Sequence, residues 1–217
     1  LVPETIGSLA YMSRHLDEMR RNVVSGFNLS CVGDERAFSH VETRYGDTVA
    51  DSALRAALFG KDNFKTYSFL QRGSDERQYG AAGIELPVAG FCRSKYGEFP
   101  EYHTSADNFD VVTAAGVQGA FDVMAEIIEA FENGLYPQCT VLGEPQLGKR
   151  GLYPTISQKG NHSTINARMD FLTYADGSNS LFDIARIIGV PLKTVLEEAT
   201  LMAKHDLVSV ADHPSMR

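Results

Sequence analysis

Three polar clusters in this sequence follow short apolar segments and carry residue types that suit hydrolytic chemistry. They are Glu4, then Arg72 with residues 73–77, and then residues 102–107, which include His103. Open α/β sheets place their ligand sites in the loops that follow strands. Carboxylates and one imidazole gathered there have the donor atoms for a divalent metal, since neutral His supplies nitrogen and Asp or Glu supplies oxygen.

Each cluster also has an ordinary structural interpretation. Glu4 suits a solvated position at a helix entry, Asp75 suits a turn or a cap, and His103 suits a surface position in a polar loop. For any one of these residues without the others, the structural interpretation is the stronger. Only their combination favours a functional one.

The composition is that of an ordinary soluble globular protein. The chain has 217 residues, of which 43% are hydrophobic and 22% charged, and its net charge is −8. Three cysteines outside any Cys-x-x-Cys motif disfavour a disulfide framework and fit a reducing, cytoplasmic compartment. No apolar run approaches the roughly 18 residues of a membrane span. The acidic balance disfavours general nucleic-acid binding.

The apolar patterning predicts an α/β sheet sandwiched by helices over the first two thirds of the chain. Ser8 is the expected N-cap of the first helix. The expected helices lie at residues 8–20, 48–58 and 117–135, and the expected strands at 23–31, 64–70 and 87–92. Helices that alternate with short strands indicate this fold class.

A small winged-helix domain is expected at the C-terminal end. Residues 143–161, rich in Gly and Pro, read as a linker between an α/β part at 1–142 and a winged helix at 162–217. The terminal domain holds five basic and seven acidic residues, so DNA binding is disfavoured. We expect a packing or dimerisation module, which leaves a homo-oligomer open.

The longer motifs resemble a known family. Residues 67–79 and 93–107, together with 3–8, 31–34 and the linker, are similar to bacterial aminopeptidase-like proteins of surface-polysaccharide biosynthesis. Their peptidase domain is similar to the zinc-dependent aminopeptidase and glutaminyl-cyclase superfamily. The resemblance covers nearly the whole chain and implies a cytoplasmic hydrolase that uses zinc as cofactor.

The resemblance implies a role for each candidate residue. His103 would be a zinc ligand with Asp107 supporting its loop, and Glu4 would be the general base that takes a proton from zinc-bound water. Asp75, Arg77, Arg72 and Tyr102 would line the substrate pocket. For the two arginines, pairing with nearby carboxylates is an equal alternative to binding a substrate carboxylate or phosphate.

Three positions depart from the superfamily pattern. Thr5 stands where many members have a second, metal-binding Glu, Ser30 replaces an acidic ligand unless Asp34 substitutes for it, and Glu76 replaces a His. These departures favour one zinc over two, or an unusual substrate. The other histidines considered, His15, His40 and His162, read as solvated side chains.

The expected function is cleavage of an amide bond in a small amine- or sugar-linked substrate. The family's first histidine and bridging aspartate have no counterpart in this sequence, and a catalytic zinc needs three protein ligands. We therefore expect a C-terminal part of a longer enzyme, with the upstream part as its partner. The alternative is a non-catalytic binding or regulatory protein that retains the peptidase fold.

Overall fold

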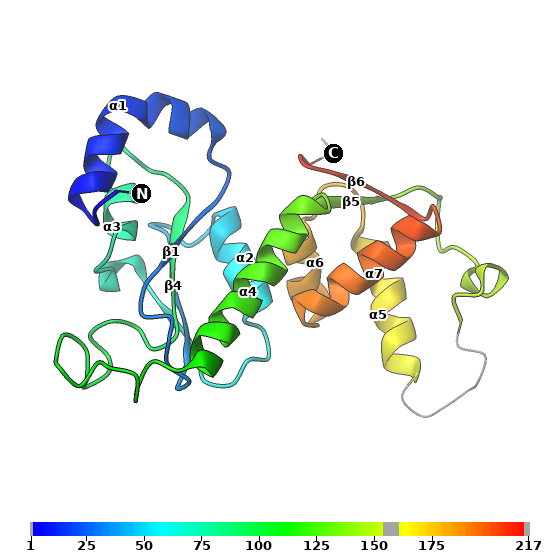
Figure 1. Cartoon of the computed structure of the whole chain (residues 1–217). Coiled ribbons are helices and arrows are strands. Elements are labelled where there is room, and N and C mark those ends of the chain that lie inside the picture. Colours follow the sequence, from blue (N-terminus) through cyan, green and yellow to red (C-terminus); the bar gives the residue numbers. More distant parts are fainter. Residues whose placement is uncertain (1, 154–160, 215–217) are drawn as a thin grey trace. The chain divides into compact units, whose positions relative to one another are not determined.

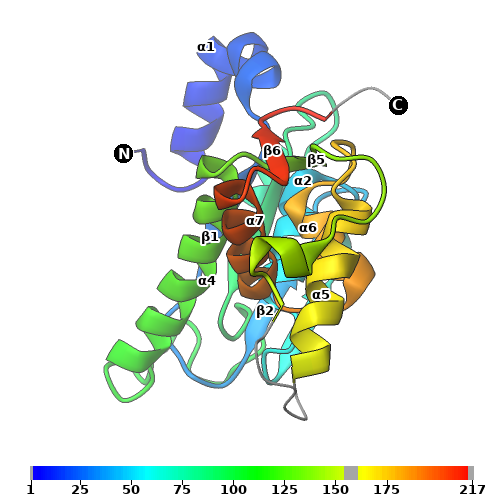
Figure 2. The ribbon, with the colours of Figure 1, turned by 90° about the vertical axis from the view of Figure 1, so that its right-hand side faces the viewer.

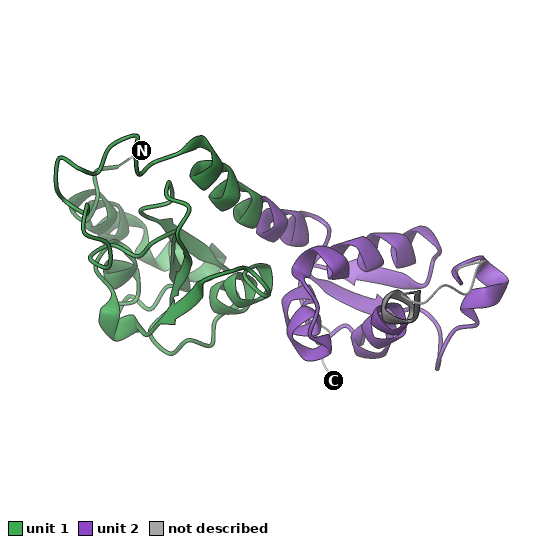
Figure 3. Ribbon diagram, turned by 90° about the horizontal axis from the view of Figure 1, so that it is seen from below, with its two compact units in different colours: residues 1–124 green, residues 125–217 purple. Residues whose placement is uncertain are grey.

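The computed structural model describes residues 2–153 and 161–214, and for 161–165 only the backbone is considered. The chain forms two compact units, Leu1–Met124 and Ala125–Arg217, which divide within the helix α4 (Ala114–Glu132) (Figures 1 and 3). The division comes earlier than the expected boundary at residue 142. The reason is that strand β5 (Tyr136–Cys139) pairs with β6 (Val208–Ala211) and so belongs with the second unit.

The first unit is built on a mixed four-stranded sheet. Its strand order is β1 (Gly26–Leu29), β4 (Val88–Cys92), β2 (Phe38–Val41) and β3 (Phe64–Tyr67). β1 is parallel to β4 and β2 is parallel to β3, whereas β2 and β4 are antiparallel. Every residue of β4 is buried. The α/β class is confirmed, although β2 was not among the expected strands.

Helices and short helical turns surround this sheet. They are α1 (Ile6–Asn22), α2 (Val49–Ala57), the 3-10 turn η1 (Phe69–Gln71), α3 (Glu76–Tyr79) and α4. Met12 of α1 packs with Leu86 and Val88, and Leu16 and Met19 join the same cluster. Met12, Leu16 and Met19, spaced by four and three residues, thus form the face of α1 that packs on the protein.

The predicted cap of α1 is wrong. The helix begins at Ile6, two residues before the expected start, so Ser8 is buried inside the helix and is not its N-cap. The Ser8 hydroxyl donates a hydrogen bond to Asp75 instead. A residue 67 positions away therefore decides the environment of Ser8, and local pattern does not reveal it.

His40 is the second correction, because it is buried with a relative exposure of 0%. Its Nε2 lies 2.9 Å from Oδ1 of Asp51, which is equally buried. Asp51 also accepts hydrogen bonds from the backbone N–H groups of Thr43 and Thr48, and with Thr48 it forms the capping box of α2. The buried carboxylate is what makes a polar ring acceptable inside the sheet layer.

The second unit contains a helical trio closed by a two-stranded sheet. α5 (Asn161–Tyr174), α6 (Leu181–Ile188) and α7 (Leu192–Lys204) pack together, and the turn η2 (Leu147–Arg150) precedes them (Figure 2). Ser180 and Asp183 form a capping box, and Gly189 ends α6 at φ +67°. The largest fully buried side chains of this unit are Ile127, Leu147, Phe171, Leu181, Phe182, Ile184, Leu192, Met202 and Leu207.

This arrangement confirms the expected winged helix. The sequence pattern predicts helices at 181–188 and 191–205. α6 has the first of these ranges, and α7 is one residue shorter at each end than the second. Residues 154–160 of the expected linker lie outside the described residues. In the described part of the chain, no helix is long and apolar enough to cross a membrane.

Asp51→Asn is expected to destabilise the first unit by about 2–3 kcal/mol, because an amide cannot satisfy all the donors around a buried carboxylate. Burial alone would raise the pKa of Asp51, but hydrogen bonds from His40, Thr43 and Thr48 outweigh it and hold the pKa below its usual range. The stabilisation is therefore complete above the unfolded pKa of about 4 and is lost as the pH falls below it.

Urea unfolding at pH 7 and at pH 3 measures this effect. The exposed Asp62→Asn is the matched control and should change the unfolding free energy little at either pH. Equal stability of Asp51→Asn and the parent at pH 7 would contradict the assignment.

Candidate active site

The Glu4 segment is a turn rather than the end of a strand. Residues 2 and 3 have no regular structure, and Glu4 and Thr5 form a turn that leads into α1. The N–H of Ile6 donates to the carbonyl of Glu4 at 2.7 Å, and the N–H of Gly7 donates to the carbonyl of Pro3 at 2.9 Å. The turn leaves the Glu4 side chain exposed.

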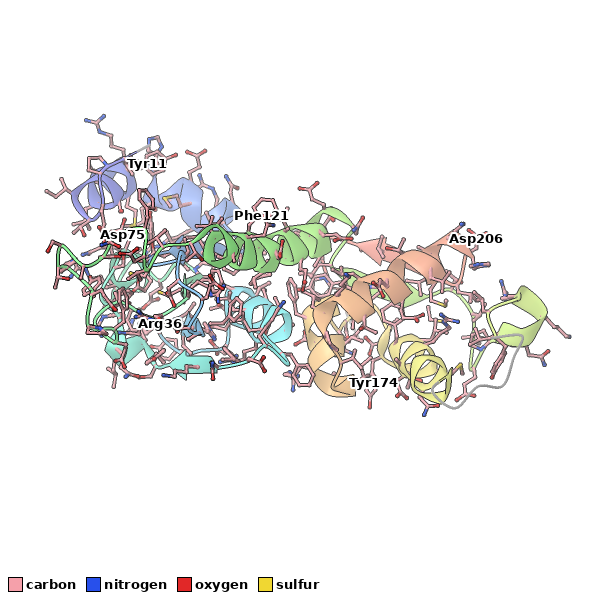
Figure 4. All side chains as sticks on the ribbon, turned by 60° about the horizontal axis from the view of Figure 1, so that its bottom comes forward. Tyr11, Arg36, Asp75, Phe121, Tyr174 and Asp206 are labelled. Carbon is pink, nitrogen blue, oxygen red and sulfur yellow. The ribbon has the colours of Figure 1, made fainter. Side chains whose placement is uncertain are left out.

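The loop after β3 meets this turn across a long sequence separation. Asp75 accepts the N–H of Thr5 at 2.7 Å, and its second oxygen accepts the Ser8 hydroxyl. The Ser74 hydroxyl donates to Oε1 of Glu4 at 2.9 Å. Figure 4 labels Asp75, which lies beside α1. Two of the three predicted clusters, Glu4 and residues 73–77, are thus brought together.

The two arginines of this loop have different surroundings. Arg77 is exposed and donates to the Thr5 hydroxyl at 3.1 Å, so it belongs to the contact between turn and loop. Arg72 folds back on its own segment, where it donates to the carbonyl of Phe69 and lies over that ring at 4.7 Å. The pairing of either arginine with a carboxylate, which was the structural alternative, is not found among the described residues.

Glu76 is the buried anchor of the same loop. Its Oε1 accepts the N–H groups of Gly73 and Ser74 and the Tyr96 hydroxyl, at 2.8, 3.1 and 2.5 Å. Its Oε2 accepts the side-chain amide of Asn28 at 2.7 Å. Burial alone would raise the pKa of Glu76, but these hydrogen bonds lower it below the usual range. The glutamate that departs from the superfamily pattern is therefore an ionised structural group.

A small cavity lies where β1 ends. It has a volume of about 240 Å³, and its walls include Cys31, Asp34, Phe99 and Asp107. Burial raises the pKa of the Cys31 thiol, a hydrogen bond with Ser30 lowers it, and the charges of Asp107, Asp34 and Glu4 raise it further. Carboxylates from three separate segments thus disfavour ionisation of the Cys31 thiol.

Asp34 is fully occupied within this region. It is buried and accepts the backbone N–H and the hydroxyl of Ser94, each at 2.8 Å, and the N–H of Arg36 at 2.9 Å. These three hydrogen bonds explain why a carboxylate can be buried here. They also leave Asp34 poorly placed to serve as the substitute metal ligand.

Tyr102 and His103 form one side of the third cluster. Their rings are stacked with centroids 3.9 Å apart, and His103 is exposed at φ +59°, a conformation that is uncommon outside glycine. Burial raises the pKa of Tyr102, and the charges of Cys31 and Glu4 add to the shift. The backbone N–H of Asp107 donates to the carbonyl of Thr104, and the supporting role of its side chain stays a prediction.

Arg36 holds this third cluster to the loop after β1. Its guanidinium makes two hydrogen bonds of 2.8 Å to the two oxygens of Glu101, the residue before Tyr102. Such a bidentate pair restricts orientation as well as distance. Arg36, labelled in Figure 4, was not singled out from the sequence, because nothing in the local pattern relates it to a residue 65 positions away.

The described residues do not by themselves fit a zinc site. Within 2–153 and 161–214, no three or more His, Cys, Asp or Glu side chains are grouped so that they could hold a metal. His103 stands beside Tyr102 and Asp34 is occupied, so a three-ligand centre is not assembled from this part of the chain. His15 is half exposed near Glu18, and the side chain of His162 is outside the described residues.

Ser74, Glu76 and Arg36 are the residues of this region whose roles the sequence did not reveal. Ser74 and Glu76 lie within the predicted 73–77 cluster, yet their partners are visible only in three dimensions. The catalytic role of Glu4 and the metal role of His103 stay predictions. So do the substrate-binding roles of Asp75, Arg77, Arg72 and Tyr102.

Two family models match the chain in succession. The one described as "Domain of unknown function (DUF4910)" matches residues 1–134, and one described as winged helix-turn-helix matches residues 135–210. These ranges place the change of domain close to the start of β5.

Known proteins are similar to the chain over almost its whole length. A Clostridium acetobutylicum protein named "Putative polysaccharide biosynthesis protein with aminopeptidase-like domain" is 35% identical over 215 residues, which are 96% of this chain and 48% of that protein. A crystal structure of a "putative peptidase" from the same organism matches with a TM-score of 0.80 and 33% identity over 96% of this chain and 47% of its own. The chain spans about half the length of these two relatives.

A third match is weaker. The aminopeptidase from Aneurinibacillus sp. strain AM-1 aligns with 57% of this chain and 29% of its own, at 21% identity and a TM-score of 0.46. The name of the 35% identical relative confirms the resemblance to aminopeptidase-like proteins, the 33% identical structure is named as a putative peptidase, and the second family model confirms the winged helix.

Arg36→Gln is expected to raise the pKa of Glu101. The hydrogen bonds from Arg36 lower that pKa to about 2. Without the guanidinium it should return toward the usual value of about 4.3. Because the folded pKa is depressed, the pair is intact at neutral pH and is lost only as the pH falls through about 2.

A ¹³C NMR titration of labelled glutamate side chains measures this shift. Arg44→Gln, which removes the similar exposed pair with Glu85, is the control and should leave Glu101 unchanged. An unaltered Glu101 titration in Arg36→Gln would show that the pair does not form in solution.

Proposed function

Since the chain belongs to the DUF4910 family and continues into a winged helix-turn-helix domain, we propose that it is part of a zinc-dependent aminopeptidase-like hydrolase. The observation that carries the proposal is the convergence of the Glu4 turn with the loop at residues 73–77. A relative named for an aminopeptidase-like domain, at 35% identity, and a putative peptidase, at 33% identity, support the same assignment.

Glu4 is the proposed general base. Its Oε1 accepts the Ser74 hydroxyl, and no hydrogen bond to its Oε2 is found among the described residues. One oxygen is therefore held while the other is available to take a proton from the attacking water and return it to the leaving amine. Proton transfer of this kind contributes roughly 10²- to 10⁴-fold to a rate.

The proposed zinc dependence requires ligands that the described residues of this chain do not supply. His103 is the proposed ligand from the described residues, and the remaining ligands would come from elsewhere in the native protein. The relatives that the chain matches are about twice its length, since it covers 48% and 47% of them. The proposed partner of this chain is accordingly the other half of such a protein.

The proposed substrate is a small molecule with an amide bond near a free amine or a sugar-linked amino group. Polysaccharide biosynthesis appears in the name of the Clostridium acetobutylicum relative and supports this choice. Arg77 is exposed beside the Glu4 turn, where a guanidinium suits a substrate carboxylate or phosphate.

A non-catalytic binding protein with a peptidase fold is the second candidate. It is favoured by Glu76, which is buried and structural where the superfamily has a histidine, and by the occupied carboxylate of Asp34. The two candidates differ in one measurable property, which is turnover that a chelator abolishes.

Glu4→Gln in the native full-length protein tests the proposal. With a panel of aminoacyl p-nitroanilides, kcat should fall by about 10²- to 10⁴-fold, because the amide cannot accept the proton. Chelation should abolish the parent activity and added zinc should restore it.

Glu18→Gln, an exposed change on α1, is the matched control and should keep the parent rate. A Glu4→Gln variant as active as the parent would reject Glu4 as the base. A parent protein that hydrolyses no member of the panel, with or without zinc, would favour the binding protein.

A further inference from the structure

We propose that Ser74 and Asp75 are positioning residues, which clamp a strained turn so that the Glu4 carboxylate points in a fixed direction. The inference rests on the proposed role of Glu4 and deepens it. It assigns to Asp75 a task different from lining the substrate pocket.

The strain is located at Thr5. This residue has φ +61° and ψ −67°, and the N–H of Ile6 donates to the carbonyl of Glu4 on its other side. Together these describe a γ-turn of the rare type with positive φ, which is strained. Positive φ is also a genuine outlier for a β-branched side chain. Such a conformation persists only where the surrounding structure enforces it.

Asp75 supplies that enforcement. Its Oδ1 accepts the N–H of Thr5 at 2.7 Å, and its Oδ2 accepts the hydroxyl of Ser8, one turn into α1. One oxygen is thus engaged with the strained residue and the other with the first turn of the helix that follows it. Arg77 adds a bond of 3.1 Å to the Thr5 hydroxyl. The carboxylate fixes where α1 begins and hence where Glu4 lies.

Ser74 sets the direction of the Glu4 side chain. Its hydroxyl donates to Oε1 of Glu4 at 2.9 Å, and Ser74 is itself buried with 7% relative exposure. A buried donor has few alternative positions, so the exposed carboxylate it holds loses much of its rotational freedom. Holding a reacting group in place is a large source of rate acceleration.

Glu76 fixes the loop that carries Ser74 and Asp75. This carboxylate, with 0% exposure, accepts the N–H groups of Gly73 and Ser74 and ties them to Asn28 of β1. A continuous series of hydrogen bonds thus runs from the sheet through Glu76 and Ser74 to Glu4. The position of Glu4, the proposed general base, therefore depends on the position of the sheet.

Kinetics of Ser74→Ala in the native full-length protein test the first half of the proposal, with aminoacyl p-nitroanilides as probes. We expect kcat to fall at least tenfold with KM within twofold, and Ser74→Thr, which keeps the hydroxyl, to recover most of the rate. Ser13→Ala, the same change at an exposed site on α1, should have no effect. A raised KM with unchanged kcat would overturn the positioning role, as would an unaltered kcat.

Hydrogen–deuterium exchange at single-residue resolution tests the clamp without any activity. Asp75→Ala should speed exchange of the Thr5 amide at least tenfold, whereas Asp17→Ala, an exposed change on α1, should not. Ser8→Ala, which removes only one donor, gives a smaller increase and covers the case in which Asp75→Ala fails to fold.

The two proposals fail separately. If the protein hydrolyses nothing but exchange at Thr5 depends on Asp75, the clamp stands and the hydrolase assignment is rejected. If Thr5 exchanges at the same rate in the parent, in Asp75→Ala and in Ser8→Ala, the clamp is rejected whatever the activity.

Discussion

The buried carboxylate of Glu76 is the interaction on which the candidate site depends. An ionised group out of water is costly unless hydrogen bonds replace its solvation, and here four donors do so. They come from β1, from the loop after β3 and from Tyr96, so one charge joins three segments. Because hydrogen bonds to a charged acceptor are stronger than neutral ones, the loop geometry is set firmly. An apolar residue here would leave the N–H groups of Gly73 and of the buried Ser74 without the acceptor that they share.

A buried carboxylate that accepts backbone N–H groups follows each of the strands β1, β2 and β3. Asp34 follows β1 and accepts the N–H groups of Arg36 and Ser94, while Asp51 follows β2 and accepts those of Thr43 and Thr48. Glu76 does the equivalent after β3. Each carboxylate is buried at 5% exposure or less and accepts two backbone N–H groups together with at least one side-chain donor. Loops that would otherwise be mobile thereby become rigid supports for exposed side chains such as Glu4.

Sequence patterning predicted the parts of this structure that depend on local periodicity. The helix α6, with its capping box and its terminal glycine, has the bounds expected from these signals. β2 was missed because His40 interrupts its apolar pattern, and the reason for that histidine is Asp51, eleven residues later. β5 was missed because Pro137 and Gln138 make a poor strand pattern, and pairing with β6 decides its conformation.

For the candidate site, residue types were readable from the sequence but their tasks were not. The motifs at 73–77 and 102–107 identified the right loops, and the structure brings the first of them to Glu4. What no pattern revealed is that Asp34 and Asp75 have their oxygens engaged within the chain. A carboxylate's availability depends on which donors surround it, and those donors lie about 60 to 70 positions away.

These constraints imply that different parts of the proposed hydrolase orient the reacting groups and bind the metal. The described residues supply orientation: a strained turn held by Asp75, a base held by Ser74, and an imidazole on a loop pinned by Arg36. They do not supply a complete metal centre, because no three ligands are grouped among them and the oxygens of Asp34 and Asp75 already accept hydrogen bonds from within the chain. Hydrogen bonds that fix geometry and lone pairs that bind a metal compete for the same oxygens. A chain that uses its buried carboxylates for rigidity therefore leaves the ligands that would join His103 at the proposed metal to come from elsewhere in the native protein.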